Sequence, residues 1–503
     1  MRRPRRSAAI ADMRSVRAAV AMIGVCLLTA LLGGPVAHAD GAATGADLAV
    51  AQSLGDRELT VIVRRAQPVP GPLRVDIITH TGTAPGTLAL GALPVDRAGP
   101  GSSTTVDLGE RAGPYPATLR VDHAGPWELS VGDGVRTARI PFVVAAQVVT
   151  PWERAAYGGF FAAGALLLVS IGTALVSERG WITLLPAGAT VAALTVGITG
   201  AVLSSGAPPP RPTGSLLDPT SATVGDPYPE RALPMTTNYS RPPVNLTPSV
   251  RGEAVAGRPV DLVLSLTDGA TGRPVDDLLV ADDALVHLMV VGPPDRLWHR
   301  HPIRTAPGVF EVRLTLPEPG DYAVAAELSR RGGGVQLLRS AIRVSAAAAP
   351  GTTAVAQPTG EQPTRSPGPS ERTHEPARNV STATDLVAGV PGILTARFGG
   401  PANLQLWLGM LGHLIAVGPL PDGVPAGTAA TTAPIWAHAH AMASMPAPGA
   451  QPPDETVAAY GPDISFTYTF PLPGRYLVWA QAERGYSVLT APAVVDVKAG
   501  APQ

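Results

Sequence analysis

The sequence contains almost no cysteine and little charge. Its one cysteine, Cys26, lies in an N-terminal apolar run, so the rest of the chain has no disulfide, no thiolate metal ligand and no cysteine nucleophile. Only 15% of the 503 residues are charged, and 38 basic residues balance 39 acidic ones. Because there is no basic surplus, the composition predicts no nucleic-acid partner.

Common catalytic motifs are also missing from the sequence. We find no G-x-S-x-G, no phosphate-binding P-loop, no G-x-G-x-x-G after a predicted strand and no H-E-x-x-H. The paired carboxylates Asp282 and Asp283 fall in a predicted loop, where a solvated turn explains them. The sequence therefore predicts a protein that is not an enzyme.

Glycine and proline, in contrast, are abundant, with 55 and 54 residues. With so little charge, this composition is typical of turn-rich β-domains joined by proline-rich linkers. The length suffices for about three domains plus connectors. Two segments have linker composition, residues 206–247 and 347–381, and we expect both to be extended or disordered.

The N-terminus has the pattern of a signal peptide over residues 1–39. Six arginines and one acid precede an apolar run from Ala18 to Gly34. Small residues, Ala37 and Ala39, then occupy the two positions that a signal peptidase reads. The alternative is an uncleaved anchor, although the apolar run is short for a membrane span.

Two longer apolar runs predict a hairpin of two transmembrane helices, over residues 155–176 and 182–204. Only three residues, 177–179, separate the charge-free segments, so the helices should be antiparallel neighbours. Small residues recur at every fourth position of the second run, namely Ala189, Ala193, Gly197 and Ala201. Such a stripe favours close helix packing, although a general richness in alanine and glycine explains it nearly as well. Neither run has an ionisable side chain, so we expect an anchor in the lipid bilayer rather than an ion pathway.

The arginine-rich start also predicts the orientation of the chain, because positively charged flanks stay in the cytoplasm. After the first exported segment, the chain crosses the membrane inward and then crosses it again outward. Residues 40–150 and 206–503 are therefore both expected on the extracytoplasmic side of the cell membrane.

Residues 40–150 are predicted to form an exported immunoglobulin-like β-sandwich. About seven short segments between residues 46 and 148 alternate apolar and polar residues and are separated by Gly, Pro and Asp. The cysteine pair of true immunoglobulin domains is missing. The isolated His80 and His123 are expected on the surface or in loops that satisfy their hydrogen bonds.

Residues 248–346 and 382–499 are predicted to be two copies of one unit. Each copy has a histidine that opens a strand, then a tryptophan and a His-x-His pair, and later a Pro-x-Pro-Gly-x-Tyr turn. Six of the ten histidines fall in these repeated positions: His287, His299 and His301 in the first copy, and His413, His438 and His440 in the second. The tryptophans, Trp298 and Trp436, are expected to pack rather than to bind a ligand.

The His-x-His spacing suits a metal ion. Residues i and i+2 of a strand point to the same face about 6.5–7 Å apart, so the pair can offer two imidazoles to one ion. The preceding histidine lies on the adjacent strand and can add a third. In the first copy an odd-length hairpin loop brings His287 to the face of the pair, and an even one turns it away. The sequence leaves this register open.

Imidazole suits copper, zinc or nickel, and no thiolate is present to favour zinc. In the second copy Met442 and Met445 follow His440, and their thioethers favour copper. A structural role is the alternative, in which the histidines hydrogen-bond across a sheet edge and the methionines fill a loop.

At these repeats the sequence resembles the YtkA-like family, exported β-sandwich modules of the wider CopC-like, cupredoxin-like kind that actinobacterial membrane proteins often carry. The likeness covers residues 248–499 and rests on HLMVV, WHRHP and LPEPGDY in the first copy, and on GHLIAV, HAH and FPLPGRYLVWAQ in the second. It implies sandwiches of roughly seven to eight strands, an envelope location and a link to metal handling, chiefly of copper. The second copy departs from the pattern, because a longer insertion precedes His438 and Ala441 stands where Pro302 follows the first pair.

The predicted fold class is mostly β: three immunoglobulin-like or cupredoxin-like β-sandwich domains plus a two-helix transmembrane hairpin. We expect a non-catalytic, membrane-anchored envelope protein that binds or handles a copper ion through its histidine clusters. The alternative is a metal-free structural or protein-interaction module, displayed at the cell surface on proline-rich stalks, with another envelope protein as its partner.

Overall fold

The computed structural model describes most of the chain between residues 47 and 500. The described residues are 47–64, 69–95, 97, 99–144, 151–177, 179–205, 242–331, 333–347, 379–382, 385–441 and 456–500. The predicted signal peptide 1–39, most of the linkers 206–247 and 347–381, and the candidate ligands Met442 and Met445 lie outside them. Within the described residues the chain is mostly β, arranged in six sheets with three helices.

Residues 47–144, which we call the N-terminal β-region, form two four-stranded sheets with the orders β1-β2-β3-β6 and β5-β4-β7-β8. The strands are β1 (Leu48–Leu54), β2 (Arg57–Val63), β3 (Gly71–Thr79), β4 (Gly86–Pro94), β5 (Ser102–Leu108), β6 (Gly113–Val121), β7 (Gly125–Gly132) and β8 (Thr137–Val144). Buried and exposed residues alternate along strands such as β6, as the sequence predicts. The buried faces enclose Trp127 and Phe142.

Residues 242–347, the first repeat, form a four-stranded sheet, β14-β15-β10-β9, and a five-stranded sheet, β11-β16-β12-β13 with β17 paired to β16. The strands are β9 (Val244–Arg251), β10 (Pro259–Asp268), β11 (Leu278–Leu279), β12 (His287–Gly292), β13 (Arg296–Arg300), β14 (Ile303–Ala306), β15 (Val309–Thr315), β16 (Gly320–Arg330) and β17 (Gly334–Val344). Strand β9 begins inside the segment predicted as linker 206–247, so the folded region starts earlier than expected.

Residues 379–500, the second repeat, form a three-stranded sheet, β18-β20-β23, and a five-stranded sheet, β19-β25-β24-β21-β22. The elements are β18 (Asn379–Thr382), β19 (Leu386–Val387), β20 (Pro391–Arg397), β21 (Gly412–Gly418), α4 (Ala426–Thr432), β22 (Ile435–Ala441), β23 (Asp463–Thr469), β24 (Gly474–Arg484) and β25 (Ser487–Lys498). Strand β18 lies partly in the predicted linker 347–381, so this boundary is also earlier than expected.

The two repeats share local structure at the turn that both sequences contain. The hydroxyl of Tyr322 donates to the carbonyl of Glu318 at 2.8 Å, and that of Tyr476 donates to the carbonyl of Leu472 at 2.9 Å. Each tyrosine ring lies over a glycine that ends the histidine-bearing strand. A Cβ on Gly292 would lie 2.1 Å from the ring of Tyr322, and one on Gly418 would lie 2.6 Å from Tyr476. These shared constraints support the interpretation that the regions are copies of one unit.

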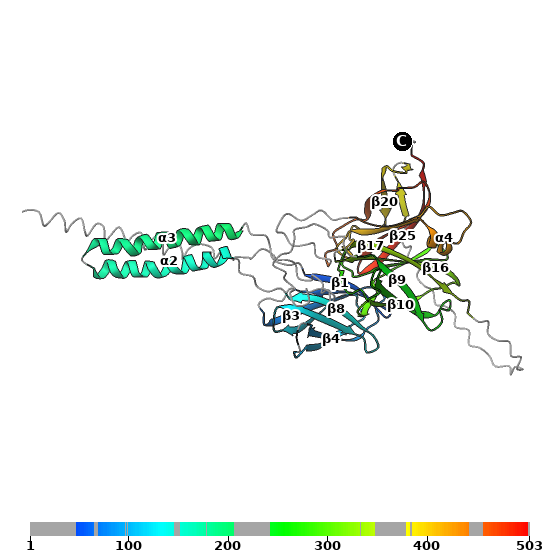
Figure 1. Ribbon diagram of the computed structural model, residues 1–503. Helices are drawn as coiled ribbons and strands as arrows, with labels where there is room; N and C mark the ends of the chain where they lie inside the picture. Colours follow the sequence, from blue (N-terminus) through cyan, green and yellow to red (C-terminus); the bar gives the residue numbers. More distant parts are fainter. Residues whose placement is uncertain are drawn as a thin grey trace, which may run out of the picture. The chain divides into compact units, whose positions relative to one another are not determined.

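The five-stranded sheets of the two repeats pack against each other through a shared apolar cluster, which we call the inter-repeat face. Its residues are Met289, Val291, Ala323 and Ala325 from the first repeat, and Ile415, Val417, Leu420, Ala426, Ala429, Ala430, Ala433, Trp436, Leu477 and Trp479 from the second. Helix α4 of the second repeat covers β16 of the first (Figure 1). Strands β12 and β21 are buried along their whole lengths, because both of their faces are covered.

The N-terminal β-region belongs to the same compact unit as the repeats. It shares one continuous apolar core with the first repeat. An ion pair joins Arg136 to Asp261 at 3.1 Å, and another joins Arg304 to Glu128 at 3.0 Å. All three β-regions meet at a small apolar cluster formed by Ala51, Ala284, Trp407 and Leu408.

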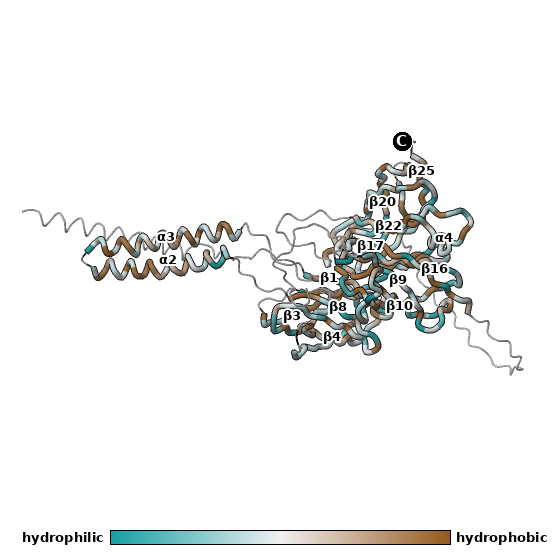
Figure 2. The backbone as a smooth tube through the Cα atoms, viewed as in Figure 1, coloured by the Kyte–Doolittle hydropathy of each residue, from teal (hydrophilic) through white to brown (hydrophobic). Residues whose placement is uncertain are grey.

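Helices α2 (Pro151–Val176) and α3 (Gly180–Ser205) form the predicted hairpin, a separate unit (Figure 1). Both are long and apolar enough to cross a membrane. Figure 2 shows apolar residues along both helices. Many large apolar side chains face outward, including Phe161 at 79% exposure and Leu175 at 81%. An apolar surface of this kind is consistent with a bilayer environment.

Small residues let the two helices approach closely. A Cβ on Gly159 would lie 2.4 Å from the backbone nitrogen of Gly197, and one on Gly200 would lie 2.6 Å from that of Ala156. Of the four residues in the predicted stripe only Gly197 is buried, and Ala201 is exposed. Two residues of the stripe, Ala193 and Gly197, do lie at the contact, since the same Cβ on Gly159 would also be 2.8 Å from the carbonyl oxygen of Ala193. The other buried residues of α3, Thr183, Thr190 and Gly200, lie outside the stripe.

Candidate metal centre

Strands β12 and β13 bring the three histidines of the first repeat together, in a group that we call the first triad: His287, His299 and His301. The strands pair so that Met289 lies opposite His299, and the loop between Gly292 and Arg296 has three residues. This odd length turns His287 to the face of the His-x-His pair. The ligand atoms of the three side chains lie within 4.8 Å of one another.

Strands β21 and β22 build the equivalent second triad: His413, His438 and His440. His413 lies opposite His440, and Ile415 lies opposite His438. The long insertion between these strands, which carries α4, leaves the register as it is in the first repeat. The ligand atoms of this triad also lie within 4.8 Å of one another. Each group of three histidines named from the sequence is thus assembled.

Hydrogen bonds orient the first histidine of each triad. The Nε2 atom of His287 lies 3.0 Å from the carbonyl oxygen of Ala281, and that of His413 lies 3.1 Å from the carbonyl oxygen of Trp407. A carbonyl only accepts, so in both rings Nε2 carries the proton and Nδ1 keeps its lone pair. That Nδ1 atom points at the next ligand: it lies 3.4 Å from Nε2 of His299 in the first triad and 3.1 Å from Nε2 of His438 in the second.

Burial keeps these imidazoles neutral. His287, His299, His301 and His413 are between 0% and 4% exposed. Burial, and then neighbouring imidazoles, lower the pKa of His299, His301, His413 and His438 well below the usual value. Burial likewise lowers the pKa of His287. Near neutral pH these rings therefore keep the lone pair that a metal ion requires.

Three buried ring nitrogens have no hydrogen-bond partner among the described residues: Nε2 of His301, Nδ1 of His438 and Nε2 of His440. A buried polar atom without a partner costs about 1–3 kcal/mol. Native proteins rarely leave such atoms unpaired, so each needs an explanation, and an ion bound by the ring is one.

The two triads lie side by side across the inter-repeat face. The ring centroids of His299 and His438 are 5.1 Å apart, and those of His287 and His438 are 5.0 Å apart. The sequence predicts the triads as separate sites and does not predict this juxtaposition. A signal for it was present, because HLMVV in β12 and HLIAV in β21 are apolar on both faces and so predict sheets covered on both sides.

Side chains from the opposite repeat surround each triad. The Nδ1 atom of His299 donates to Oε1 of Gln481 at 2.9 Å. Around the second triad, Glu327 lies 3.6 Å from Nδ1 of His438, which is too long for a hydrogen bond, and Asp282 lies 3.8 Å from Nδ1 of His440. Glu327 pairs with His287 in the sheet of its repeat as Gln481 pairs with His413, so the acid and the amide occupy equivalent positions.

Trp407 packs against histidines of both triads. The ring of Trp407 lies 4.7 Å from that of His413 and 5.5 Å from that of His299. The two tryptophans named from the sequence do pack, but on opposite faces of their sheets. Trp298 directly precedes His299 and so points away from it, whereas Trp436 lies two residues before His438 and points to the same face. Trp298 contacts Tyr322 in its own repeat, whereas Trp436 belongs to the inter-repeat face.

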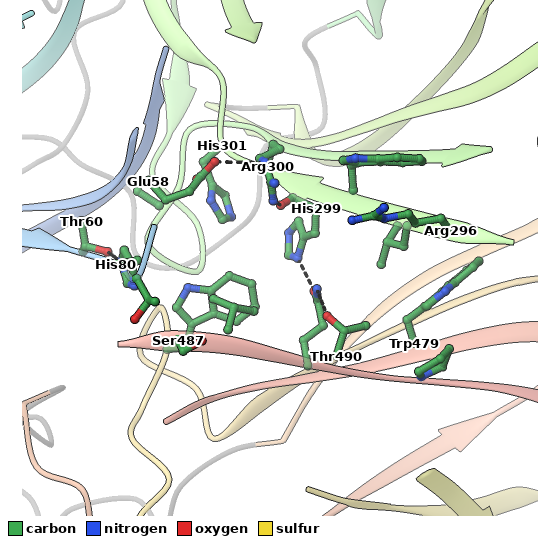
Figure 3. A pocket seen from close by; sticks show the side chains of 18 of the residues that line it. Glu58, Thr60, His80, Arg296, His299, Arg300, His301, Trp479, Ser487 and Thr490 are labelled. Atoms are coloured by element: carbon green, nitrogen blue, oxygen red, sulfur yellow. Dashed lines mark hydrogen bonds and ion pairs between the residues drawn. The ribbon is translucent and has the colours of Figure 1, made fainter. Parts of the chain in front are cut away.

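A cavity of about 630 Å³ opens beside the first triad, where the three β-regions meet. His299 and His301 line it (Figure 3). An ion pair between Glu58 and Arg300, 3.0 Å apart, crosses from the N-terminal β-region to the first repeat. The backbone nitrogen of Ser53 donates to the carbonyl oxygen of His301 at 2.7 Å, which fixes the strand end that carries this ligand.

His80 also lines this cavity, and its role was missed. It lies in a loop and is hydrogen-bonded, as expected, but it is buried: Nε2 is 3.0 Å from the hydroxyl of Thr60 and Nδ1 is 2.5 Å from Oε1 of Glu483 in the second repeat. Figure 3 shows Thr60 beside His80. His123, the other isolated histidine, pairs with the exposed Asp122. A lone histidine in a sequence carries no indication of a partner 403 residues away.

Comparisons with known proteins bear on one part of the chain. A family model described as "Domain of unknown function (DUF8832)" matches residues 377–499, which span the second repeat. No curated protein matches the chain.

Some solved structures show a weak likeness. A tetra-tandem repeat from the extending region of a large adhesion protein is 12% identical, with 90% of this chain and 74% of that chain covered and a TM-score of 0.16. Dimeric latent PorU from Porphyromonas gingivalis is 9% identical, with coverage of 90% and 33% and the same TM-score. A DUF4785 family protein from Legionella pneumophila is 11% identical, with coverage of 49% and 56%, again at 0.16. Scores this low carry no argument about function.

Proposed function

We propose that this protein is a non-catalytic, membrane-anchored envelope protein that binds copper through its two histidine triads and holds or passes on the ion. In this proposal α2 and α3 anchor the chain in the lipid bilayer, and the β-regions are three sandwich domains on the extracytoplasmic side. The resemblance of residues 248–499 to YtkA-like and CopC-like modules points in the same direction.

The observation that carries the proposal is the spacing of buried, lone-pair-bearing nitrogens. Metal–nitrogen bonds of about 2.0–2.1 Å in a tetrahedral site put neighbouring ligand nitrogens roughly 3.3–3.4 Å apart. The facing nitrogens of His287 and His299 are 3.4 Å apart, and those of His413 and His438 are 3.1 Å apart. The rings are therefore already close to the positions that an ion requires.

The donor set favours copper among the metals that imidazole binds. The only cysteine of the chain lies in the predicted signal peptide, so no thiolate draws the choice toward zinc. Two methionines, Met442 and Met445, follow the second triad directly in the sequence and offer soft thioethers.

The test is copper binding by the full-length protein in detergent, with bound metal measured by mass spectrometry and affinity by chelator competition. The wild type should bind two ions per chain. The variant His438→Ala/His440→Ala should bind one and keep nearly the melting temperature of the metal-free wild type. The control His123→Ala, which removes a histidine outside the triads, should still bind two. If the double variant unfolds without metal, the histidines are structural and the metal-free interaction module is the better reading.

The orientation in the membrane has a separate test. In a Cys26→Ser background, cysteines placed at Ser103 and at Ser370 should both react with a membrane-impermeant thiol reagent on intact cells, because both flanks of the hairpin are expected outside. Labelling at one position alone would contradict the proposed topology. It would not contradict the proposed copper binding.

A further inference from the structure

We infer that the two triads form a single two-ion centre at the inter-repeat face, in which the bound ions interact, rather than two independent sites. The inference rests on the proposed function and adds that neither repeat builds its site alone. It concerns six imidazoles that the sequence divides between segments more than 100 residues apart.

Ring distances between the triads are similar to those within them. Within the triads, centroids are separated by 4.5 Å for His438 and His440 and by 5.6 Å for His287 and His299. Between the triads, the separations are 5.0 Å for His287 and His438, 5.1 Å for His299 and His438, and 5.8 Å for His299 and His413. The six rings therefore form one continuous cluster.

The contacts between the triads have the pattern of a two-fold arrangement. The pairings show that His287 is equivalent to His413, and His299 to His438. The contact of His287 with His438 has its counterpart in the contact of His413 with His299, and the pair His299–His438 lies between them. Self-complementary contacts of this kind are what two copies related by a two-fold axis make. Two ions, one in each triad, would lie on either side of the His299–His438 pair.

Each triad also depends on the other repeat for its orientation and charge. Gln481 of the second repeat accepts the hydrogen bond from His299, and Glu327 and Asp282 of the first repeat lie beside His438 and His440. Neutral imidazoles cannot offset the repulsion between two nearby cations in a buried site. The two carboxylates supply negative charge where it is needed, and a repeat on its own would lack these groups.

The experiment is electron paramagnetic resonance of the full-length protein in detergent, loaded with two equivalents of Cu(II). Two interacting ions should give a dipolar-broadened spectrum with a half-field transition, or a loss of signal relative to the copper measured. His299→Ala/His301→Ala and His438→Ala/His440→Ala should each bind one ion and give an ordinary mononuclear spectrum. The control His123→Ala should keep the wild-type spectrum.

The outcomes separate this inference from the proposed function. If the wild type binds two ions and its spectrum is the sum of two isolated mononuclear signals, the inference is overturned and copper binding stands. If the wild type binds no copper, the proposed function itself fails. The wild-type spectrum needs no variant, so the test remains decisive even if one double variant does not fold.

Discussion

The first and second triads use the same ligands in the same register, but they lie in different surroundings. The first triad faces a cavity of about 630 Å³, and its His299 is oriented by a neutral amide, that of Gln481. The second triad has the carboxylate of Glu327 in the equivalent place and that of Asp282 close by. Both carboxylates also act on His287 of the first triad, where they oppose the lowering of its pKa by burial. The His440 side chain is 16% exposed, whereas His301 is 4% exposed as a whole residue.

This difference shows where two copies of a metal-binding unit can diverge. The three histidines correspond one to one, so the two sites differ in the groups around them. Because each triad is surrounded by side chains of the other repeat, a change in one repeat alters the site of its neighbour. Negative charge beside the second triad should make it the tighter site for Cu(II). The cavity should be the route by which copper reaches the buried first triad, whereas His440 of the second triad is itself partly exposed.

Acid should have the largest effect, and it should act on both triads. Burial and neighbouring imidazoles lower the pKa of four triad histidines well below the usual value. The unfolded chain takes up protons as the pH falls below about 6.5, while the folded metal-free protein does not. The free energy of unfolding should therefore fall with decreasing pH, by about 1.4 kcal/mol per pH unit for each such histidine between its unfolded-state and folded-state pKa.

Denaturant unfolding of the metal-free protein between pH 7.5 and 5.0 measures this effect. His299→Ala/His301→Ala should flatten the pH dependence more than His438→Ala/His440→Ala does. The first variant removes two of the four histidines whose pKa is lowered well below the usual value, whereas the second removes one of them, His438. A pH dependence that neither variant changes would contradict the assignment. In the folded protein, bound copper should also persist below pH 6.5, since protons compete only near the lowered pKa.

The second largest effect should be on copper affinity, when the charged or neutral side chain beside each triad is replaced by the other kind. Glu327→Gln should weaken Cu(II) binding at the second triad by about 10–100-fold, the usual effect of removing a group that supports a metal ligand. Gln481→Glu should strengthen binding at the first triad. Chelator competition on each variant measures both changes, with Glu318→Gln as the control. Equal effects of Glu327→Gln on both triads would remove the distinction between them.

The cavity should influence the rate of copper loss more than the affinity. Ser487 lines the cavity and belongs to neither triad, so Ser487→Phe should narrow the access to the first triad. Copper transfer from the first triad to a chelator should slow by less than about tenfold, because the ligands and their supporting groups are unchanged. Stopped-flow transfer kinetics measure this rate, and an equal slowing at the second triad would show that the cavity is not the route.

The smallest effect concerns the two methionines that follow the second triad. Met442→Leu/Met445→Leu should lower the Cu(I) affinity of the second triad and leave its Cu(II) affinity nearly constant, since thioethers favour the softer ion. Competition with a Cu(I)-specific chelator tests this expectation. An unchanged Cu(I) affinity would mean that three imidazoles bind the ion unaided.

The sequence predicted the parts of the site that depend on local periodicity. The His-x-His spacing placed two ligands of each triad on one face, and the three-residue loop after Gly292 decides the side on which His287 lies. The same periodicity explains the opposite roles of Trp298 and Trp436, which a motif match alone had treated as equivalent. The parity of short strands and loops can be read residue by residue.

What the sequence could not supply was contact between distant segments. The meeting of His287 with His438, or of His80 with Glu483, depends on how whole sheets pack, and no local pattern encodes that packing. In α3 the fourfold spacing indicated a stripe from Ala189 to Ala201, whereas the buried residues are Thr183, Thr190, Gly197 and Gly200, of which only Gly197 belongs to the stripe. The side of a helix that meets its neighbour depends on the neighbour as well as on the helix itself.

The bond between Ser53 and the strand end at His301 has a consequence for how the chain is made. The N-terminal β-region leaves the ribosome first, yet its contact surface is completed by residues that follow the helical hairpin. If α2 and α3 cross the membrane, the N-terminal β-region and the first repeat lie on the same side because the chain crosses twice between them. In a chain that lacks one of these helices, Arg136 and Asp261 would lie on opposite faces of the bilayer. The N-terminal β-region could then not form its contacts with the first repeat.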